Sequence, residues 1–393
     1  MPPLWQHCCE SARAGHNERV NLPTAGANLP ALRSHNAALV LALLRDCALR
    51  GGAGVSRQEL AERTGLTPQA VSKITARLRA EGLVEEAGRR ASTGGKPRTD
   101  LALAVRARYA VGAHLDGERL TAVLTDLAGR TVADRTLPLD LGLPVAEALP
   151  AIAAGLRTVL ALAPAPVVGV GVGMRGPLDH TTGVLHRVTG FPHWSGCPLR
   201  AELTARLHLP VAVDKNTNTA ALSVLPHQDG NGDGDAAAAD SDPGDSFAYL
   251  HLGTGLGAAL VLGGALHRGG RTGAGEFGHQ VVQLDGPVCK CGNRGCLEAL
   301  CLAAVAAGDP RGAARLLGVG AANLAALLDV DRIVLGGGTV AAHPDLFRTE
   351  VAAVLADRGR PLPVGLGRPL AVAEGAALLA LAPLFSGTLA AAA

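Results

Sequence analysis

The chain has 393 residues, of which 48% are hydrophobic, 18% are charged and 51 are glycine. This length allows two or three domains with cores of their own, and the composition excludes a disordered or fibrous protein. The net charge of +2 at pH 7 hides an asymmetry: residues 31–100 hold 12 Lys and Arg against 7 Asp and Glu, whereas residues 227–246 hold 6 Asp and no Lys or Arg. The basic region is therefore the better candidate for a polyanionic partner.

No run of 18 or more apolar residues occurs, and residues 1–30 lack the apolar segment of a secretory signal. We therefore expect a cytoplasmic protein that has no membrane partner. Three of the eight cysteines fall between positions 289 and 296. In a reducing compartment such clustering favours a metal site over disulfides.

The first predicted elements are a flexible arm over residues 1–30 and a helix over residues 31–47, whose apolar residues at 39, 40, 43 and 44 share one face. Ser56 and Glu59 form a capping box that begins a second helix, and Gly65 ends it. Thr67 as N-cap and Pro68 at the first helical position begin a third helix, which runs to about residue 80. Two helices joined by so short a turn are typical of a helix-turn-helix.

The third helix divides into an apolar face and a polar face. Its buried face is expected to hold Val71, Ile74 and Leu78. The polar side chains suited to DNA are Gln69, Ser72 and Lys73 for base edges and Arg77 for phosphate.

Residues 82–86 and 101–105 alternate in hydrophobicity and are expected to pair as a hairpin. The loop between them is small and basic, and its Lys96 and Arg98 are candidates for phosphate contacts. The loop alone fits a solvated charged hairpin equally well. Together with the capped helices it predicts a winged helix-turn-helix over residues 31–104, which binds double-stranded operator DNA.

From residue 105 onward the pattern changes to apolar strands, glycine turns and Ala/Leu-rich helices, which predicts an α/β architecture. Residues 227–246 interrupt this pattern with Gly, Asp and Ala, and we expect a disordered acidic insertion there. Glycine-rich loops follow apolar strands at 252–257 and 335–338. Such loops can hold phosphate, but each fits a plain tight turn equally well.

The strongest chemical signal is a histidine followed by three cysteines. His279, Cys289, Cys291 and Cys296 supply one imidazole and three thiolates, which together can close a tetrahedral shell around Zn²⁺. A closed shell has no open position for an activated water. The sequence therefore predicts a structural zinc ion, held beside Glu276 and Glu298.

These motifs resemble the ROK family, which groups sugar kinases with transcriptional repressors that share their fold. The resemblance covers about residues 31–385 and is carried by Gly-Glu-Phe-Gly-His at 275–279, Cys-x-Cys-Gly-x-x-Gly-Cys-x-Glu at 289–298 and the wing segment Thr-Gly-Gly-Lys-Pro at 93–97. It implies a two-lobed ribonuclease H-like or actin-like sugar kinase fold over residues 105–393. It also implies that Glu276, His279 and Glu298 contact sugar hydroxyls.

The departures from the kinase pattern concern the residues that catalysis needs. Where the family has Asn-Asp-x-Asn, this chain has Lys215, Asn216, Thr217 and Asn218, so the catalytic Asp is an amide. An amide can contact a sugar hydroxyl but cannot take up its proton, and no other base stands nearby in sequence. We therefore expect Asn216 to bind sugar and no residue to be catalytic. Lys215 suits an acidic or phosphorylated ligand if it points inward, and it points outward equally well.

Two further segments depart from the kinase pattern. The first phosphate loop reads His-Leu-Asp-Gly-Glu at 114–118, which breaks the glycine pair and is expected to bring the negative charge of Glu118 towards the triphosphate. No ATP binding is expected. Gly190 replaces a sugar-contacting Asn of the family.

The leading hypothesis is a regulator, acting as a repressor of carbohydrate genes, which lies on the nucleoid when bound to DNA. We expect a homodimer or a dimer of dimers whose effector is a sugar or a sugar phosphate, because symmetric dimers read paired half-sites. The alternative is an active ATP-dependent sugar kinase with an attached DNA-binding domain. A third possibility is a zinc-stabilised dimerisation module that binds no sugar.

Overall fold

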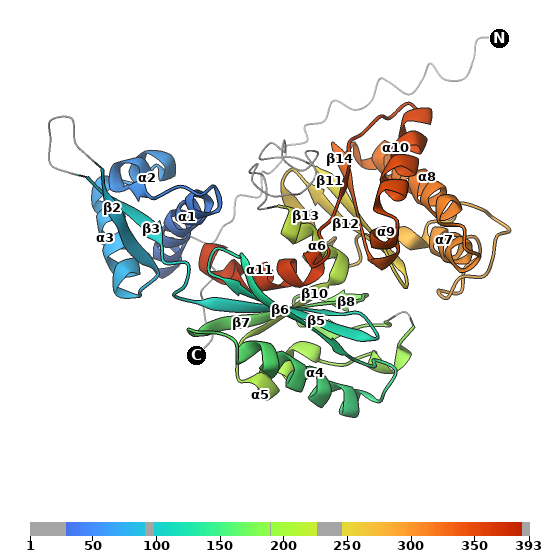
Figure 1. The fold of residues 1–393 in the computed structure, drawn as a ribbon, viewed down its shortest axis with the longest axis horizontal. Coiled ribbons are helices and arrows are strands. Elements are labelled where there is room, and N and C mark those ends of the chain that lie inside the picture. The colour runs from blue at the N-terminus through green and yellow to red at the C-terminus, as the bar shows by residue number, and fades with distance from the viewer. Residues whose placement is uncertain (1–28, 91–97, 189, 226–245, 387–393) are drawn as a thin grey trace, which may run out of the picture.

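The computed structural model describes residues 29–90, 98–188, 190–225 and 246–386. In chain order, an N-terminal domain of helices and a small sheet is followed by two α/β lobes (Figure 1). No helix in these ranges is long and apolar enough to cross a bilayer.

The N-terminal domain has the winged helix-turn-helix order that the sequence predicts. Its elements are α1 (Leu29–Leu49), β1 (Val55–Ser56), α2 (Arg57–Thr64), α3 (Pro68–Ala80), β2 (Val84–Arg90) and β3 (Arg98–Leu103). The three strands form a sheet of order β1-β3-β2. Helix α1 begins at Leu29, two residues before the predicted start at residue 31, and residues 1–28 lie outside the described ranges.

Local capping explains where α2 and α3 begin and end. Ser56 Oγ accepts from the Glu59 amide at 3.2 Å, and Gly65 ends α2 in the left-handed region at φ 68°. Thr67 Oγ1 accepts from the Ala70 amide at 3.2 Å, one residue before α3 begins. The capping box is only half formed, because the Glu59 carboxylate lies 4.0 Å from Arg63 rather than bonding back to the Ser56 amide.

The wing hairpin is longer than predicted. Val84 pairs with Leu103 and Arg90 with Arg98, with a bulge between Glu86 and Gly88. The sequence prediction ended the strands early because charged residues follow the alternating runs. The wing tip, residues 91–97, lies outside the described ranges and includes Lys96.

The first lobe is a five-stranded sheet of order β10-β7-β4-β5-β6. Its strands are β4 (Tyr109–Leu115), β5 (Arg119–Asp126), β6 (Thr131–Pro138), β7 (Val167–Met174) and β10 (Val211–Lys215). The pairs β4·β5 and β5·β6 are antiparallel, whereas β7 runs parallel to both β4 and β10. Helices α4 (Val145–Leu160) and α5 (Leu199–Leu207) cover one face (Figure 1). A small hairpin, β8 (Leu178–Asp179) with β9 (Val184–Leu185), follows β7.

The second lobe repeats this topology. Its sheet has the order β13-β12-β11-β14-β15, formed by β11 (Phe247–Leu252), β12 (Leu256–Leu262), β13 (Ala265–His267), β14 (Arg332–Gly336) and β15 (Val364–Leu366). Helices α7 (Leu297–Ala306), α8 (Pro310–Leu328) and α10 (Pro344–Asp357) pack around a common core on one side, and the short α9 (Gly338–Ala342) follows β14. Two sheets of the same order confirm the predicted two-lobed sugar kinase fold.

Two helices lie between the sheets, α6 (Asn216–Val224) and α11 (Ala371–Ser386) (Figure 1). Helix α11 lies directly on β4 and β7 because glycines line its path. A Cβ on Gly112 would lie 1.9 Å from the Ala373 carbonyl oxygen, and one on Gly171 would lie 1.7 Å from that of Ala376. Any larger residue would push the helix off the sheet.

The winged helix does not have a core separate from the first lobe. One apolar cluster runs from the winged helix (Val40, Leu60 and Val71, for example) through lobe residues such as Val123 to Leu381 of α11. Leu39, expected on the buried face of the first helix, is 36% exposed, and Leu41 is buried in its place. The pattern differs because α1 packs both against the rest of the winged helix and against α11, so its buried surface is not a single stripe.

The predicted acidic insertion lies almost entirely in residues 226–245, which are outside the described ranges. Its last residue, Ser246, is well anchored. The Ser246 amide donates to Asp331 Oδ2 at 2.7 Å, and its carbonyl accepts from the Asp331 amide at 2.7 Å. The second lobe therefore begins at Ser246.

Candidate functional site

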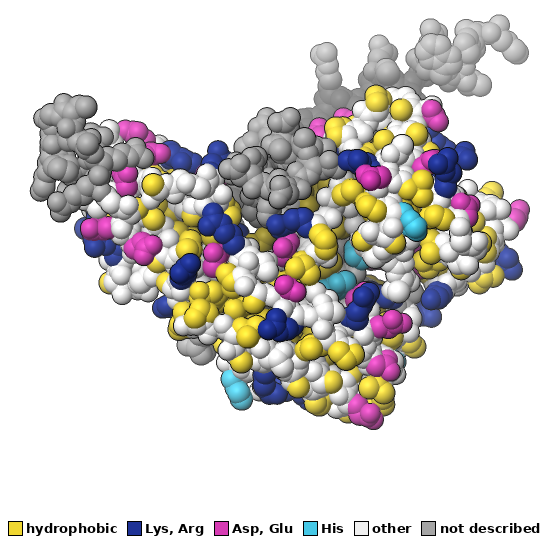
Figure 2. Space-filling view, in the orientation of Figure 1, with side chains coloured by type: hydrophobic (Ala, Val, Ile, Leu, Met, Phe, Trp, Pro, Cys, Tyr) yellow, Lys and Arg dark blue, Asp and Glu magenta, His cyan; other side chains and the backbone are white. Residues whose placement is uncertain are grey.

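A cleft between the two lobes collects most of the residues that the sequence singled out for sugar binding. Asn216, Glu276, His279 and Glu298 all line it, together with Lys215 and residues 254–257 of the glycine loop. Outside the cleft, acidic and basic side chains are mixed over the face shown in Figure 2, with no large area of one sign.

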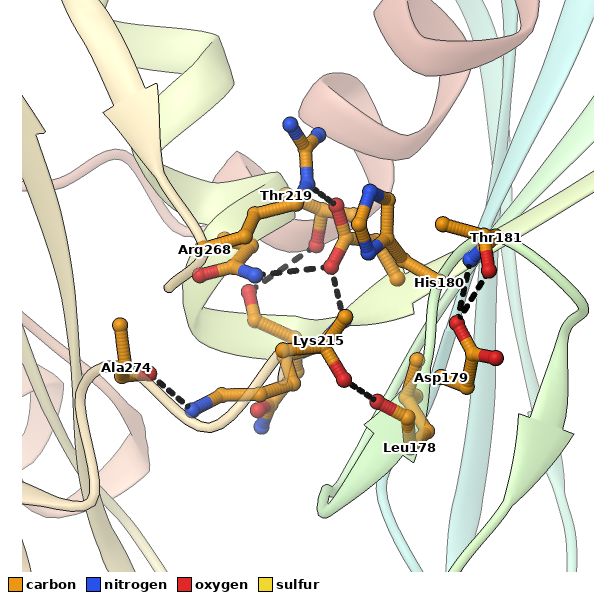
Figure 3. A network of polar contacts seen from close by, with 12 residues as sticks. Leu178, Asp179, His180, Thr181, Lys215, Thr219, Arg268 and Ala274 are labelled. Atoms are coloured by element: carbon orange, nitrogen blue, oxygen red, sulfur yellow. Dashed lines mark hydrogen bonds and ion pairs between the residues drawn. The ribbon is translucent and has the colours of Figure 1, made fainter. Parts of the chain in front are cut away.

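Lys215 points into this cleft, which decides between the two orientations that the sequence left open. It ends β10, and only 5% of its side chain is exposed. Its Nζ donates to the Ala274 carbonyl at 2.7 Å, as Figure 3 shows, and to Glu276 Oε1 at 3.1 Å. Both acceptors belong to the second lobe, so this side chain bridges the lobes.

The carboxylate of Asp214 was missed by the sequence analysis, although it stands two residues before Asn216. Its side chain is 1% exposed, and its Oδ2 accepts from Arg268 Nε at 2.8 Å. Its Oδ1 accepts from the Lys215 amide at 2.7 Å and from Asn218 Nδ2 at 2.8 Å. Asp214 is absent from the lining of the cleft and is held by these donors, so it is a second bridge between the lobes rather than a base facing a ligand.

Asn216 is the first residue of α6, directly after β10. Its side-chain Oδ1 accepts from the Thr217 amide at 2.9 Å. The amide therefore lies in the cleft where the kinase pattern has its carboxylate, and it has no proton-accepting group of useful basicity.

Two acidic residues in the cleft have different environments. Glu298 is buried at the start of α7, where its Oε2 accepts from the Leu256 amide at 2.8 Å. Glu276 has a side chain that is 44% exposed and pairs with Lys215. A fixed carboxylate and a solvated one therefore lie in the same cleft.

The predicted metal ligands form a cluster. The ligand atoms of His279, Cys289, Cys291 and Cys296 all lie within 4.8 Å of one another. The distance from His279 Nδ1 to Cys289 Sγ is 3.7 Å, as is the distance from Cys291 Sγ to Cys296 Sγ. A tetrahedral shell with zinc–sulfur bonds near 2.3 Å would place two sulfurs about 3.8 Å apart. The two observed separations are close to that spacing, so the four side chains are placed to hold a metal ion.

The cluster also fixes parts of the cleft. Cys296 is the N-cap of α7, two residues before Glu298, and His279 both lines the cleft and directs Nδ1 towards the cysteines. Burial raises the pKa of the Cys296 thiol to about 12, so a nearby cation is needed to hold it as a thiolate at neutral pH.

At the far end of the cleft, the loop that replaces the first phosphate loop is a tight turn between β4 and β5. Asp116 lines the cleft, and its Oδ1 lies 3.7 Å from Arg175 Nη2. Glu118, expected to bring negative charge towards the triphosphate, is exposed and does not line the cleft, because the turn directs the preceding carboxylate inward instead. The expectation was wrong about which acid faces the cleft.

A pair of histidines lies beneath this end. The rings of His114 and His251 meet edge to face with centroids 6.1 Å apart. Burial, followed by the charges of Arg175 and Arg119, lowers the pKa of His114 to about 4, and burial followed by His114 does the same for His251. Both rings are therefore neutral at pH 7.

The segment around Gly190 lies at the mouth of the cleft. Gly190 lines a neighbouring depression that shares Glu276 and His279 with the cleft. The Trp194 indole is buried and donates to the Leu141 carbonyl at 2.8 Å, and the Arg175 guanidinium lies 5.5 Å from the centre of the Phe191 ring. The aromatic residues fix this segment, while position 190 itself offers no side chain to a ligand.

The polar face predicted for DNA is exposed along α3. Its members Gln69, Ser72, Lys73 and Arg77 are all solvent-accessible, whereas Val71 and Leu78 are buried. Ile74 is only half-buried, and Thr75 is buried with its hydroxyl donating to the Val71 carbonyl at 2.9 Å. Arg98 lies at the start of β3, and Lys96 lies outside the described ranges.

Comparison with known families gives a match for each of the two parts. Residues 110–306, half of the chain, match the ROK family. The chain belongs to the ROK family. Residues 43–92 match the MarR family, within the winged helix-turn-helix.

Among curated relatives, this ROK protein is 28% identical over 246 residues to the xylose repressor of Bacillus subtilis (strain 168), covering 62% of this chain and 61% of that protein. It is 29% identical over 261 residues to the DNA-binding transcriptional dual regulator NagC of Escherichia coli (strain K12), covering 63% and 58%. The chain thus spans about three fifths of the length of these relatives.

Solved structures resemble the whole fold or its kinase-like part. A ROK family transcriptional regulator described as a homolog of the E. coli MLC protein superposes with a TM-score of 0.71 at 21% identity, covering 91% of this chain and 98% of that one. The ROK hexokinase from Thermus thermophilus superposes with a TM-score of 0.55 at 29% identity, covering 69% and 97%. The first likeness shows that the winged helix and the two lobes occur together in a known fold.

Proposed function

We propose that this ROK protein is a DNA-binding transcriptional regulator, acting as a repressor of carbohydrate genes, whose kinase-like cleft recognises a sugar without phosphorylating it. The observation that carries the proposal is Asn216. It places an amide where phosphoryl transfer needs a carboxylate, in a cleft that keeps Glu276, His279 and Glu298. The named relatives, a xylose repressor and NagC, support the same function.

The proposal divides the chain into a DNA-binding domain, residues 31–104, and a kinase-like domain, residues 105–393. The first part would bind double-stranded operator DNA through Gln69, Ser72 and Lys73 at base edges and through Arg77, Lys96 and Arg98 at phosphates. This assignment is supported by the exposed polar face of α3. A homodimer or a dimer of dimers would bring two such faces to paired half-sites.

The metal in this proposal is a structural Zn²⁺. Three cysteines and one histidine leave no open coordination position, and the ligands lie in the loop that begins α7. Zinc would fix His279 and Glu298 as parts of the sugar-binding wall.

A coupled assay of nucleotide consumption with pentoses, hexoses and hexosamines tests the absence of catalysis. We expect no sugar-dependent turnover by the wild-type protein. We also expect none from the Asn216→Asp variant, because the first phosphate loop has lost its glycine pair. Sugar-dependent turnover by the wild type would favour the alternative, an active kinase with an attached DNA-binding domain.

The roles on α3 are tested by competition between duplexes. Gln69→Ala should change which sequence is preferred. Arg77→Ala should instead weaken binding to all duplexes alike and reduce the slope of log K against log salt concentration by about 1, the value for one phosphate contact. An equal loss on specific and random DNA for both variants would contradict the division of roles.

A further inference from the structure

We propose that the effector of this cleft is an anionic carbohydrate, a sugar that carries a carboxylate or a phosphate, and that Lys215 selects it. The inference rests on the proposed function, because it assigns a ligand class to the same cleft. The observation behind it is that the two side chains of one ion pair are exposed to different extents.

Lys215 and Glu276 are unequally buried. The Lys215 side chain is 5% exposed, whereas that of Glu276 is 44% exposed, with 3.1 Å between Nζ and Oε1. A buried ammonium is strongly destabilised without a counter-charge, but a carboxylate in contact with water is stable on its own. Glu276 can therefore turn away at little cost, provided that another anion replaces it beside Lys215.

The surroundings hold Lys215 in place. A Cβ on Gly176 would lie 3.0 Å from Cγ and Cδ of the lysine, and one on Gly275 would lie 3.5 Å from its Nζ. Two glycines thus leave room for the stem and for the ammonium group. With its Nζ also bonded to the Ala274 carbonyl at 2.7 Å, the lysine stays in position while its counter-ion changes (Figure 3).

Two other acids of this region, Asp214 and Glu298, already accept from donors other than the Lys215 ammonium. Asp214 lies next to Lys215 in the chain, but its oxygens are occupied by Arg268, Asn218 and the Lys215 amide. The Glu298 carboxylate accepts from the Leu256 amide. Glu276 therefore acts as an internal substitute for the anionic group of the ligand.

The replacement of Glu276 by a ligand anion beside Lys215 has a consequence for specificity. A neutral sugar leaves the Lys215–Glu276 pair in place and can use only the acceptor positions of the Glu276 carboxylate that Lys215 does not occupy. An anionic sugar supplies the counter-charge itself and frees Glu276 for hydroxyl contacts. A charge-assisted hydrogen bond to a buried lysine corresponds to about a tenfold to a hundredfold gain in affinity.

The test is calorimetric titration of the full chain with three forms of one hexose: the neutral sugar, its uronic acid and its 6-phosphate. We expect the wild type to bind one of the anionic forms at least about tenfold more tightly than the neutral form, and the tighter one identifies carboxylate or phosphate as the source. Equal binding of the neutral and anionic forms, or binding of none of the three, would overturn the inference without any variant.

Two variants locate the effect. Lys215→Met should bring the affinity for the anionic form down to that for the neutral sugar. Arg271→Met, which removes a positive charge from an exposed position in the same loop as Glu276, should leave the preference unchanged. A preference that persists in Lys215→Met would also overturn the inference.

The same samples are assayed for binding to duplex DNA. Loss of any duplex preference in the wild type contradicts the proposed function. Intact DNA binding with no anionic preference contradicts only the ligand class.

Discussion

The contact between α1 and the first lobe predicts how firmly the winged helix is held against that lobe. Arg45 of α1 donates from Nε to the Ala128 carbonyl at 2.9 Å, and its guanidinium carbon lies 4.8 Å from the centre of the Phe385 ring in α11. A hydrogen bond from a charged donor contributes about 1.5–3 kcal/mol. A cation–π contact contributes about 0.5–1 kcal/mol.

The Arg45→Met variant should therefore weaken this contact by about 2–4 kcal/mol, which shifts its opening equilibrium on the order of 30- to 700-fold. Hydrogen exchange measures the effect directly, and we expect faster exchange in α1 and α11 but not in α3. Arg33→Met is the matched control, because this arginine lies on the same helix and its side chain is exposed, where removal of a surface charge changes stability by about 0–1 kcal/mol. Unchanged exchange in Arg45→Met, or equal changes in both variants, would refute the reasoning.

Three further predictions concern the metal, the helix α11 and pH. Chelation of the metal should lower the melting temperature and weaken sugar binding, with DNA binding by the winged helix retained; a Cys291→Ser variant should behave likewise, and an unchanged melting curve on chelation would contradict a structural role. Gly171→Ala should destabilise the first lobe by several kcal/mol in denaturant titration, since its Cβ would overlap the Ala376 carbonyl oxygen, whereas Gly270→Ala, where an added Cβ meets no atom within 4 Å, should change stability by about 1 kcal/mol or less. The pKa values of His114 and His251 are lowered from 6.5 to about 4, so between these pH values the unfolded chain binds more protons than the folded one. The free energy of unfolding should therefore fall as pH drops below about 6.5, by about 2 kcal/mol per histidine at pH 5. Replacing both histidines with Gln should flatten that dependence in urea titrations, and an identical slope would contradict it.

The sequence predicted the elements whose signals are local. The caps at Ser56, Gly65 and Thr67 lie where the pattern placed them, because capping depends on a few neighbouring backbone groups. The metal cluster was predictable for the same reason, since His279 and the three cysteines lie within 18 positions of one another.

Features that depend on distant contacts were not predictable. The buried surface of α1 includes Leu41 rather than Leu39 because the helix also packs against α11, more than 300 residues further along the chain. The direction of Lys215 was undecided because its acceptors, Ala274 and Glu276, come from the other lobe. Asp214 was overlooked because its role depends on Arg268, 54 positions away.

The central claim is that this ROK protein acts on DNA and not on nucleotide. Selection of bound fragments from genomic DNA by the full chain, repeated with the neutral and anionic sugars, tests it most directly. We predict enrichment of a two-fold symmetric site whose recovery changes when the anionic sugar is added. Recovery of fragments at random, by protein that consumes ATP when a monosaccharide is added, would contradict the account.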